Sequence, residues 1–128
     1  EHLLCVSVSL AEYPAMAALV APYPQVSVSC GEHPLHQQDE LDAELLLELA
    51  ADPKVVAVGE TGLDYFYSPD TKVLQQQAFI SHIEVANQLN KPLIVHTRDA
   101  KADTLAILRQ YQAQHCAANP HLSWLRSS

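Results

Sequence analysis

The chain has 128 residues, which is enough for one buried core and too few for two. Hydrophobic residues make up 48% and charged residues 17%, a composition that excludes a disordered tail, a collagen-like repeat and a coiled coil. The formal net charge of -8 repels phosphate backbones and anionic membranes, so any binding of nucleic acid would need a mediating cation.

The apolar runs are too short to cross a bilayer, since the longest, such as Leu3–Val6 and Val55–Val58, fall far below roughly 20 residues. The first residues lack the basic and apolar regions of a signal peptide and a start methionine, which predicts no signal peptide and a start inside the gene. Cys5, Cys30 and Cys116 are an odd, widely spaced set, which favours buried thiols and a cytoplasmic protein.

Strands and helices alternate in the predicted secondary structure. Short apolar segments predict strands at Leu3–Leu10, Val26–Cys30, Lys54–Gly59 and Pro92–His96. The intervening segments predict helices at Ala11–Ala21, Asp39–Ala51, Thr71–Asn90 and Asp99–Gln114. Strands with consecutive apolar residues are buried on both faces, so this alternation predicts four parallel β-α units. They form either a small open α/β sheet or about half of an eight-stranded barrel.

Apolar spacing within the helices predicts their buried faces. The expected core positions are Leu41, Leu45, Leu49, Phe79, Ile83, Ala86, Leu105 and Leu108. A loop is expected over Glu60–Pro69, and the three glycines, Gly31, Gly59 and Gly62, are each expected directly after a strand. Ligands of parallel α/β proteins gather at the carboxyl ends of the strands, so these turns are the place to look for a site.

Glu60 and His96 are the leading candidate pair. Each stands at the end of an apolar strand, and their separation of 36 positions corresponds to one β-α unit, so both side chains are expected at adjacent strand ends on one rim. A carboxylate and a neutral imidazole can share a divalent metal ion. The alternatives are a rim carboxylate paired with a cation and a core histidine with satisfied hydrogen bonds.

Each of the other polar residues near this rim has two possible roles. His33 and His36 could contact substrate, metal or phosphate, or order their loop through hydrogen bonds. Arg98 could bind a phosphate or pair with a nearby acid such as Asp99 or Asp103. For Asp64 a turn-capping role is favoured over support of a ligand.

Three further groups are expected to be structural. The aromatic run Tyr65–Tyr67 could stack on a base but is expected to cover the rim, and His82 is expected to be an ordinary surface or helix-face residue. Cys30 is expected to pack rather than react, although His33 nearby keeps a Cys-His nucleophile open. The chain has no Gly-x-Ser-x-Gly elbow and too few glycines for a phosphate-binding glycine loop.

Three blocks of sequence together resemble the TatD-like metal-dependent deoxyribonucleases: Gly31–Pro34, Val58–Tyr65 and Lys91–Ala100. The resemblance implies an amidohydrolase-like eight-stranded β/α barrel with one or two divalent ions, Mg, Mn or Zn, at its carboxyl-end rim. It further implies metal-assisted exonucleolytic hydrolysis of DNA, with single-stranded or 3′ ends as substrate. On this basis Glu60 and His96 are the expected metal-binding and catalytic residues, and His33 and Arg98 the expected substrate-binding residues.

The chain also departs from the family pattern. It lacks the family's opening His-x-His strand and its late Glu-Thr-Asp block, and His121 stands near the position of a further ligand but without that ligand's strand. Residues 1–116 are therefore expected to form a partial TatD-like domain, and 117–128 a frameshifted or foreign tail. Half a barrel exposes two sheet edges and apolar helix faces, so the isolated chain is expected to be marginally stable or to associate.

An incomplete metal centre predicts little or no hydrolysis by this chain. Two alternatives stay open at this point. One is an ester hydrolase on the same scaffold that cleaves an aminoacyl-tRNA bond, and the other is an inactive fragment that serves as a binding module.

Overall fold

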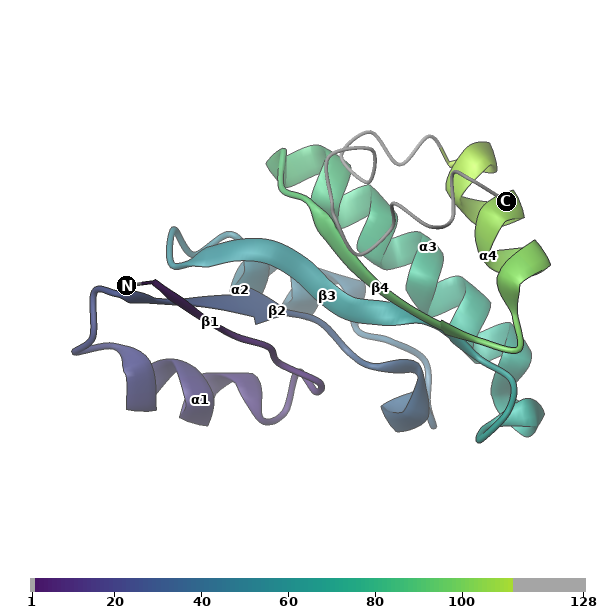
Figure 1. Ribbon diagram of the computed structural model, residues 1–128, viewed down its shortest axis with the longest axis horizontal. Helices are drawn as coiled ribbons and strands as arrows, with labels where there is room; N and C mark the ends of the chain where they lie inside the picture. The colour runs from purple at the N-terminus through teal and green to yellow at the C-terminus, as the bar shows by residue number, and fades with distance from the viewer. Residues whose placement is uncertain (1, 112–128) are drawn as a thin grey trace.

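The computed structural model describes residues 2–111, which form a four-stranded parallel sheet with strand order β1-β2-β3-β4 (Figure 1). The strands are β1 (Leu3–Cys5), β2 (Val26–Cys30), β3 (Val55–Asp64) and β4 (Leu93–Arg98). The helices are α1 (Tyr13–Val20), α2 (Ala43–Ala50), α3 (Lys72–Leu89) and α4 (Lys101–Gln110), with short 3-10 turns at Pro34–His36 and Pro69–Thr71. Parallel strands in sequential order are typical of consecutive barrel strands, so the predicted partial barrel of four β-α units is confirmed.

The core lies mainly between the sheet and the helices that Figure 1 shows behind it, α2 and α3, and the buried residues Val20 of α1 and Leu108 of α4 extend it. The predicted face of α3 is confirmed, because Phe79 and Ile83 are fully buried and Ala86 is nearly so. Leu63 of β3 and Leu46 of α2 are also fully buried. Removing such side chains from water supplies the main driving force for folding, at about 1.5–3 kcal/mol for each large one.

The leucine face predicted for α2 is confirmed at Leu41 and Leu49, which are partly buried against the core, and wrong at Leu45. The helix begins later than expected, at Ala43, because the Asp42 carboxylate caps it by accepting the Leu45 backbone N–H at 3.0 Å. Leu46 and Ala50, one turn apart, then face the core, whereas Leu45 remains 36% exposed.

The predicted first strand is too long, because β1 ends at Cys5. The next residues give their backbone groups to the rim of the sheet instead of to the β1–β2 ladder. Ser7 O accepts the Glu60 N–H at 3.2 Å, and Val8 O accepts the His33 N–H at 2.9 Å. This segment therefore passes the carboxyl end of β2 and the middle of β3, and it fixes the backbone of two candidate site residues.

The third strand is longer than predicted, since β3 continues to Asp64 through half of the expected loop. The β3–β4 register shifts between Gly59 and Thr61, which pair with Ile94 and Val95 and leave Glu60 out of the ladder. A bulge of this kind re-aims a side chain, and here it redirects the carboxylate beside the rim.

Two glycines lie within β3 rather than after it. Gly59 has φ +144°, and a Cβ there would lie 2.5 Å from Ile94 O. Gly62 has φ +135°, and a Cβ there would overlap the carbonyl oxygen of His96. Both positions need glycine because the backbones of β3 and β4 approach so closely.

The other predicted elements agree with the structure apart from a few terminal residues. The carboxyl end of the last predicted helix, Cys116, His121 and the expected tail 117–128 lie outside the described residues. None of the helices within residues 2–111 combines the length and the apolar character that a bilayer span needs.

Candidate metal centre

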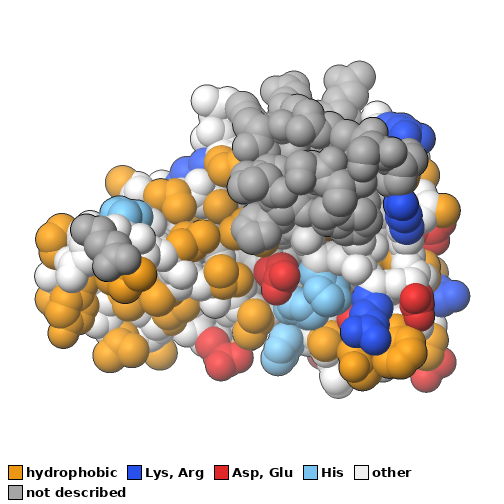
Figure 2. All heavy atoms as spheres, in the orientation of Figure 1, with side chains coloured by type: hydrophobic (Ala, Val, Ile, Leu, Met, Phe, Trp, Pro, Cys, Tyr) orange, Lys and Arg blue, Asp and Glu red, His pale blue; other side chains and the backbone are white. Residues whose placement is uncertain are grey.

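Three side chains meet at the carboxyl-end rim of the sheet. His33 follows β2, Glu60 lies in the bulge of β3 and His96 lies in β4. One donor atom from each lies within 4.8 Å of the others, which is close enough to surround a single ion. Figure 2 shows histidine side chains gathered beside an acidic side chain on this face, next to basic and hydrophobic groups.

Glu60 and His33 face each other across this cluster. Glu60 Oε1 lies 3.5 Å from His33 Nε2, and the two side chains are 29% and 10% exposed. The carboxylate is thus open to solvent and to a ligand on one side while its backbone is held by Ser7. A half-open carboxylate with fixed backbone is well suited to bind a hard cation.

His96 is oriented by a buried acid. Its Nε2 donates to Asp64 Oδ2 at 2.9 Å, and the Asp64 side chain is fully buried. Because Nε2 carries that proton, the lone pair of the neutral ring is on Nδ1, which is the nitrogen left for a metal. A carboxylate behind a histidine fixes the tautomer and the orientation of the ring.

Asp64 also shapes the loop that follows it. Its Oδ1 accepts the backbone N–H groups of Phe66 at 3.1 Å and Tyr67 at 2.8 Å. Burial alone would raise the pKa of Asp64, but these N–H groups and the His96 ring outweigh it and hold the pKa below its usual value. Asp64 therefore combines the two roles that the sequence left as alternatives.

His33 is fixed in one protonation state. Its Nδ1 accepts the Leu35 backbone N–H at 3.1 Å, so that nitrogen has no proton. Burial, followed by repulsion from His96 and His36, lowers the pKa of His33 to about 4, and the ring is neutral at pH 7. Its one proton is consequently on Nε2, the atom that faces Glu60, so His33 is better placed to donate a hydrogen bond than to bind a metal.

His36 and His82 lie apart from the donor cluster. His36 is exposed, and its ring centre lies 6.4 Å from that of His33. The expectation that His82 lies on a helix surface is wrong, because the side chain is fully buried. Its Nε2 accepts the Glu32 N–H at 3.0 Å and its Nδ1 donates to Ala78 O at 2.7 Å, which ties α3 to the loop before His33. The α3 pattern could have indicated this, since His82 lies three residues after Phe79 and four before Ala86, both on the buried face.

Arg98 pairs with neither of the acids considered for it. Within residues 2–111 no carboxylate lies within ion-pair distance of its guanidinium. The guanidinium instead lies 4.5 Å from the ring centre of Phe66 and 5.2 Å from that of Tyr67. The side chain is exposed at the end of β4, two residues beyond His96.

Cys30 has the properties of a packing residue. The side chain is fully buried, and burial raises the pKa of its thiol to about 12. A thiol that keeps its proton at pH 7 is a poor nucleophile, so the Cys-His reading loses its chemical basis.

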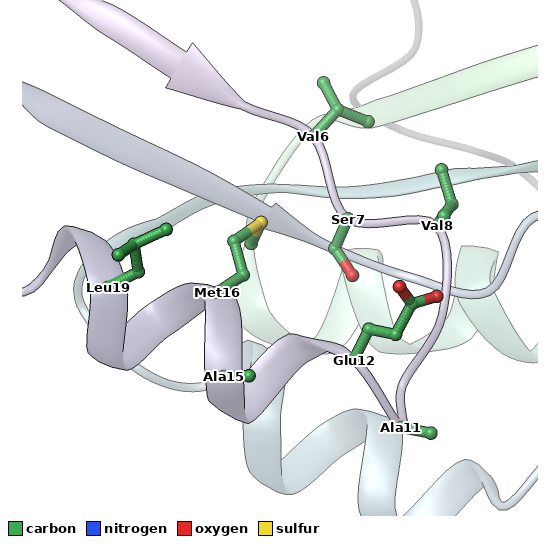
Figure 3. Close-up of a pocket in the computed structure, with 8 residues that line it drawn as sticks. All are labelled: Val6, Ser7, Val8, Ala11, Glu12, Ala15, Met16 and Leu19. Atoms are coloured by element: carbon green, nitrogen blue, oxygen red, sulfur yellow. The ribbon is translucent and has the colours of Figure 1, made fainter.

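A second concavity lies beside α1 and shares no residue with this cluster (Figure 3). Figure 3 shows Met16 and Leu19 of α1 turned toward the segment that carries Val6 and Val8. Its lining is mainly apolar and carries one acid, Glu12, so the residues for metal chemistry are those at the rim.

The donor set fits a divalent metal ion. A carboxylate oxygen from Glu60 and an imidazole nitrogen from His96 are ligands that Zn²⁺ and Mn²⁺ accept, and the carboxylate also suits Mg²⁺. When bound, such an ion polarises a phosphoryl oxygen and lowers the pKa of water. The described residues supply part of a coordination shell.

Comparison with known proteins also points to a metal-dependent hydrolase. The family model described as TatD related DNase matches residues 1–124. An uncharacterized metal-dependent hydrolase, YcfH of Escherichia coli K12, is 54% identical over 118 residues, which is 92% of this chain and 44% of that protein. The 3′-5′ ssDNA/RNA exonuclease TatD of Escherichia fergusonii is 35% identical over 112 residues, which is 85% of this chain and 43% of that protein.

A solved structure extends the similarity to the fold. The crystal structure of YjjV, a TatD homolog from Escherichia coli K12, matches with a TM-score of 0.77 and 25% identity, over 88% of this chain and 45% of that one. The chain therefore spans less than half the length of the relatives it matches.

Proposed function

This chain belongs to the TatD-related deoxyribonuclease family, and we propose that it supplies Glu60 and His96 to the divalent-metal centre of a phosphodiester hydrolase that acts on single-stranded DNA at 3′ ends. One observation carries the proposal: a carboxylate oxygen of Glu60 and a ring nitrogen of His96 lie within 4.8 Å of each other, beside His33, at the rim where α/β barrels place their active sites.

Different residues of the chain bind the ion, orient its ligand and contact the substrate in this proposal. Glu60 presents its carboxylate and His96 its Nδ1 to the ion, while Asp64 holds the His96 ring in that orientation. His33, neutral with its proton on Nε2, donates a hydrogen bond to a substrate oxygen or to Glu60. Arg98 provides the positive charge that an acidic chain needs near a phosphate.

Metal binding is the direct test. Titration of the 128-residue chain with MnCl₂ in a calorimeter should show binding that Glu60→Gln and His96→Gln each weaken at least tenfold. Glu48→Gln, which removes an exposed acid of α2, is the matched control and should bind Mn²⁺ as wild type does. Equal Mn²⁺ affinity in wild type and Glu60→Gln would refute the assignment.

Hydrolysis is a separate test. Because the described ligands complete only part of a shell, a Mg²⁺- or Mn²⁺-dependent assay on 3′-ended single-stranded DNA should show little turnover. Robust turnover that disappears in Glu60→Ala would prove this expectation of low activity wrong while supporting the metal role of Glu60.

A further inference from the structure

Two aromatic side chains beside the candidate metal centre are exposed to solvent. Phe66 is 52% exposed and Tyr67 is 63% exposed. Their rings are perpendicular, with centres 4.7 Å apart. Together with the Arg98 guanidinium that covers both rings, they form a surface that we call the aromatic platform. Exposed groups of this kind often mark an interaction site.

The platform is held in place by backbone hydrogen bonds. Asp64 Oδ1 accepts the N–H groups of Phe66 and Tyr67, and the Tyr65 N–H donates to Arg98 O at 3.0 Å. The aromatic residues are therefore positioned before any ligand arrives, which lowers the entropy cost of binding.

Tyr65, the first residue of the aromatic run, is used differently. Its hydroxyl donates to Asp103 Oδ2 at 2.8 Å and accepts from Gln76 Nε2 at 2.7 Å, so it ties the rim to α3 and α4. The expectation that the aromatic run covers the rim thus fits Tyr65. It does not explain why the next two rings are left open.

Arg98 is available to a ligand. Its guanidinium lies over the Phe66 and Tyr67 rings and has no ion pair within the part of the chain that the structure describes, so its N–H groups can reach a phosphate. A cation at this point is notable in a chain whose net charge is -8. It locally reverses the field that would repel an anionic strand.

The platform and the metal centre share one carboxylate. Asp64 Oδ2 accepts from His96, while Oδ1 of the same side chain holds the loop with Phe66 and Tyr67. A strand whose phosphate lies at the centre would place a neighbouring nucleotide near the platform. Bases of single strands are free to leave their own stack and lie on aromatic rings, whereas bases in a duplex are not.

Building on the proposed function, we propose that the aromatic platform is a nucleotide-binding subsite. A base of single-stranded DNA stacks on Phe66 or Tyr67, and Arg98 binds the adjacent phosphate. The platform contributes affinity without taking part in bond cleavage.

A base-dependent binding experiment tests this subsite. Fluorescence anisotropy would measure the affinity of the 128-residue chain for labelled dT10 and for an abasic oligonucleotide of the same length, with Mn²⁺ and with EDTA. Wild type should bind dT10 about tenfold more tightly than the abasic strand. The double variant Phe66→Ala/Tyr67→Ala should lose this preference, and Arg98→Gln should weaken both strands by a similar factor. A wild-type chain that binds both strands equally, or binds neither, would overturn the subsite.

The controls separate the platform from the metal centre. Tyr23→Ala removes another exposed tyrosine, 53% exposed, from the amino-end side of the sheet, and should bind dT10 as wild type does. The double variant Phe66→Ala/Tyr67→Ala should keep wild-type Mn²⁺ affinity. If wild type does not bind Mn²⁺ but still binds dT10 more tightly than the abasic strand, the proposed function alone is refuted. Mn²⁺ binding without a base preference would refute the subsite alone.

Discussion

The two halves of the sheet differ in how completely they are covered. In the β3–β4 half, β3 has ten residues, its Leu63 is fully buried, and the backbones of the two strands touch at Gly59 and Gly62. In the β1–α1 half, β1 has three residues, and Leu3 and Leu19 are 55% and 74% exposed. The donor atoms for a metal are on or beside the well-covered half.

This contrast has a physical reason. A metal site needs ligands held within a fraction of an ångström, and only a packed environment supplies that rigidity. Glu60, Asp64 and His96 are held by a register shift, buried hydrogen bonds and close backbone contact. The β1–α1 half offers apolar surface instead, which suits a contact with another part of a protein.

The largest expected effect comes from the closest contact in the well-covered half. Gly62→Ala places a methyl group against the carbonyl oxygen of His96 at a φ that favours glycine, so it should destabilise the chain by about 3 kcal/mol or more. Urea unfolding followed by circular dichroism measures this. Val56→Ala, at an exposed position of β3, should cost far less. A Gly62→Ala chain as stable as Val56→Ala would show that β3 and β4 are not in tight contact.

A second effect concerns acid stability in the same half. Burial lowers the pKa of His82 from 6.5 to about 4, so the folded chain binds fewer protons than the unfolded chain between these pH values. The stabilisation is present above pH 6.5 and is lost as the pH falls toward 4, with a total of about 3 kcal/mol. His82→Asn removes the titrating group, so its unfolding free energy should depend less steeply on pH in this window.

The slope should not vanish in His82→Asn, because the pKa of His33 is lowered in the same direction. Ser81→Ala, a substitution at the neighbouring half-buried position, serves as the control and should keep the wild-type pH dependence. If the unfolding free energy of wild type and of His82→Asn had the same pH dependence, folding would not lower the pKa of His82.

Much of the fold could be predicted from the sequence because it depends on apolar periodicity. The order of strands and helices, the buried face around Phe79 and Ile83, and the proximity of Glu60 and His96 all follow from that pattern and from β-α topology. The length of β1 could not be predicted, since the residues after Cys5 bond to groups at the rim that are distant in sequence.

The finer parts of the site depend on tertiary contacts that no local pattern encodes. The buried location of His82 depends on the Glu32 N–H, 50 residues away. The choice between the two roles of Asp64 also needed coordinates, because one carboxylate can cap a turn with one oxygen and hold His96 with the other. Sequence spacing brings residues near each other but does not give the atoms that face each other.

A third, smaller effect tests how the well-covered half influences the metal affinity of the candidate centre. Asp64→Asn replaces one of the two accepting oxygens with a donating NH₂ group. That NH₂ group must face either His96 Nε2–H or the N–H groups of Phe66 and Tyr67, so one of these hydrogen bonds is lost. Mn²⁺ affinity should fall about 10- to 100-fold. Calorimetry measures the affinity, and circular dichroism checks the fold. Asp70→Asn, at an exposed position, should change neither. Unchanged Mn²⁺ binding by folded Asp64→Asn would show that orientation of His96 is unimportant.

The smallest effect is expected in the β1–α1 half. Leu19 is 74% exposed, so Leu19→Ala should change the unfolding free energy by no more than about 0.5 kcal/mol. The matched variant Leu63→Ala removes the same side chain from a fully buried position and should cost about 2–5 kcal/mol. Urea unfolding measures the loss of unfolding free energy in each variant and so compares the two halves directly. If Leu19→Ala cost as much as Leu63→Ala, Leu19 would be covered in solution. A dependence of that cost on protein concentration would then show that a second copy of the chain covers it.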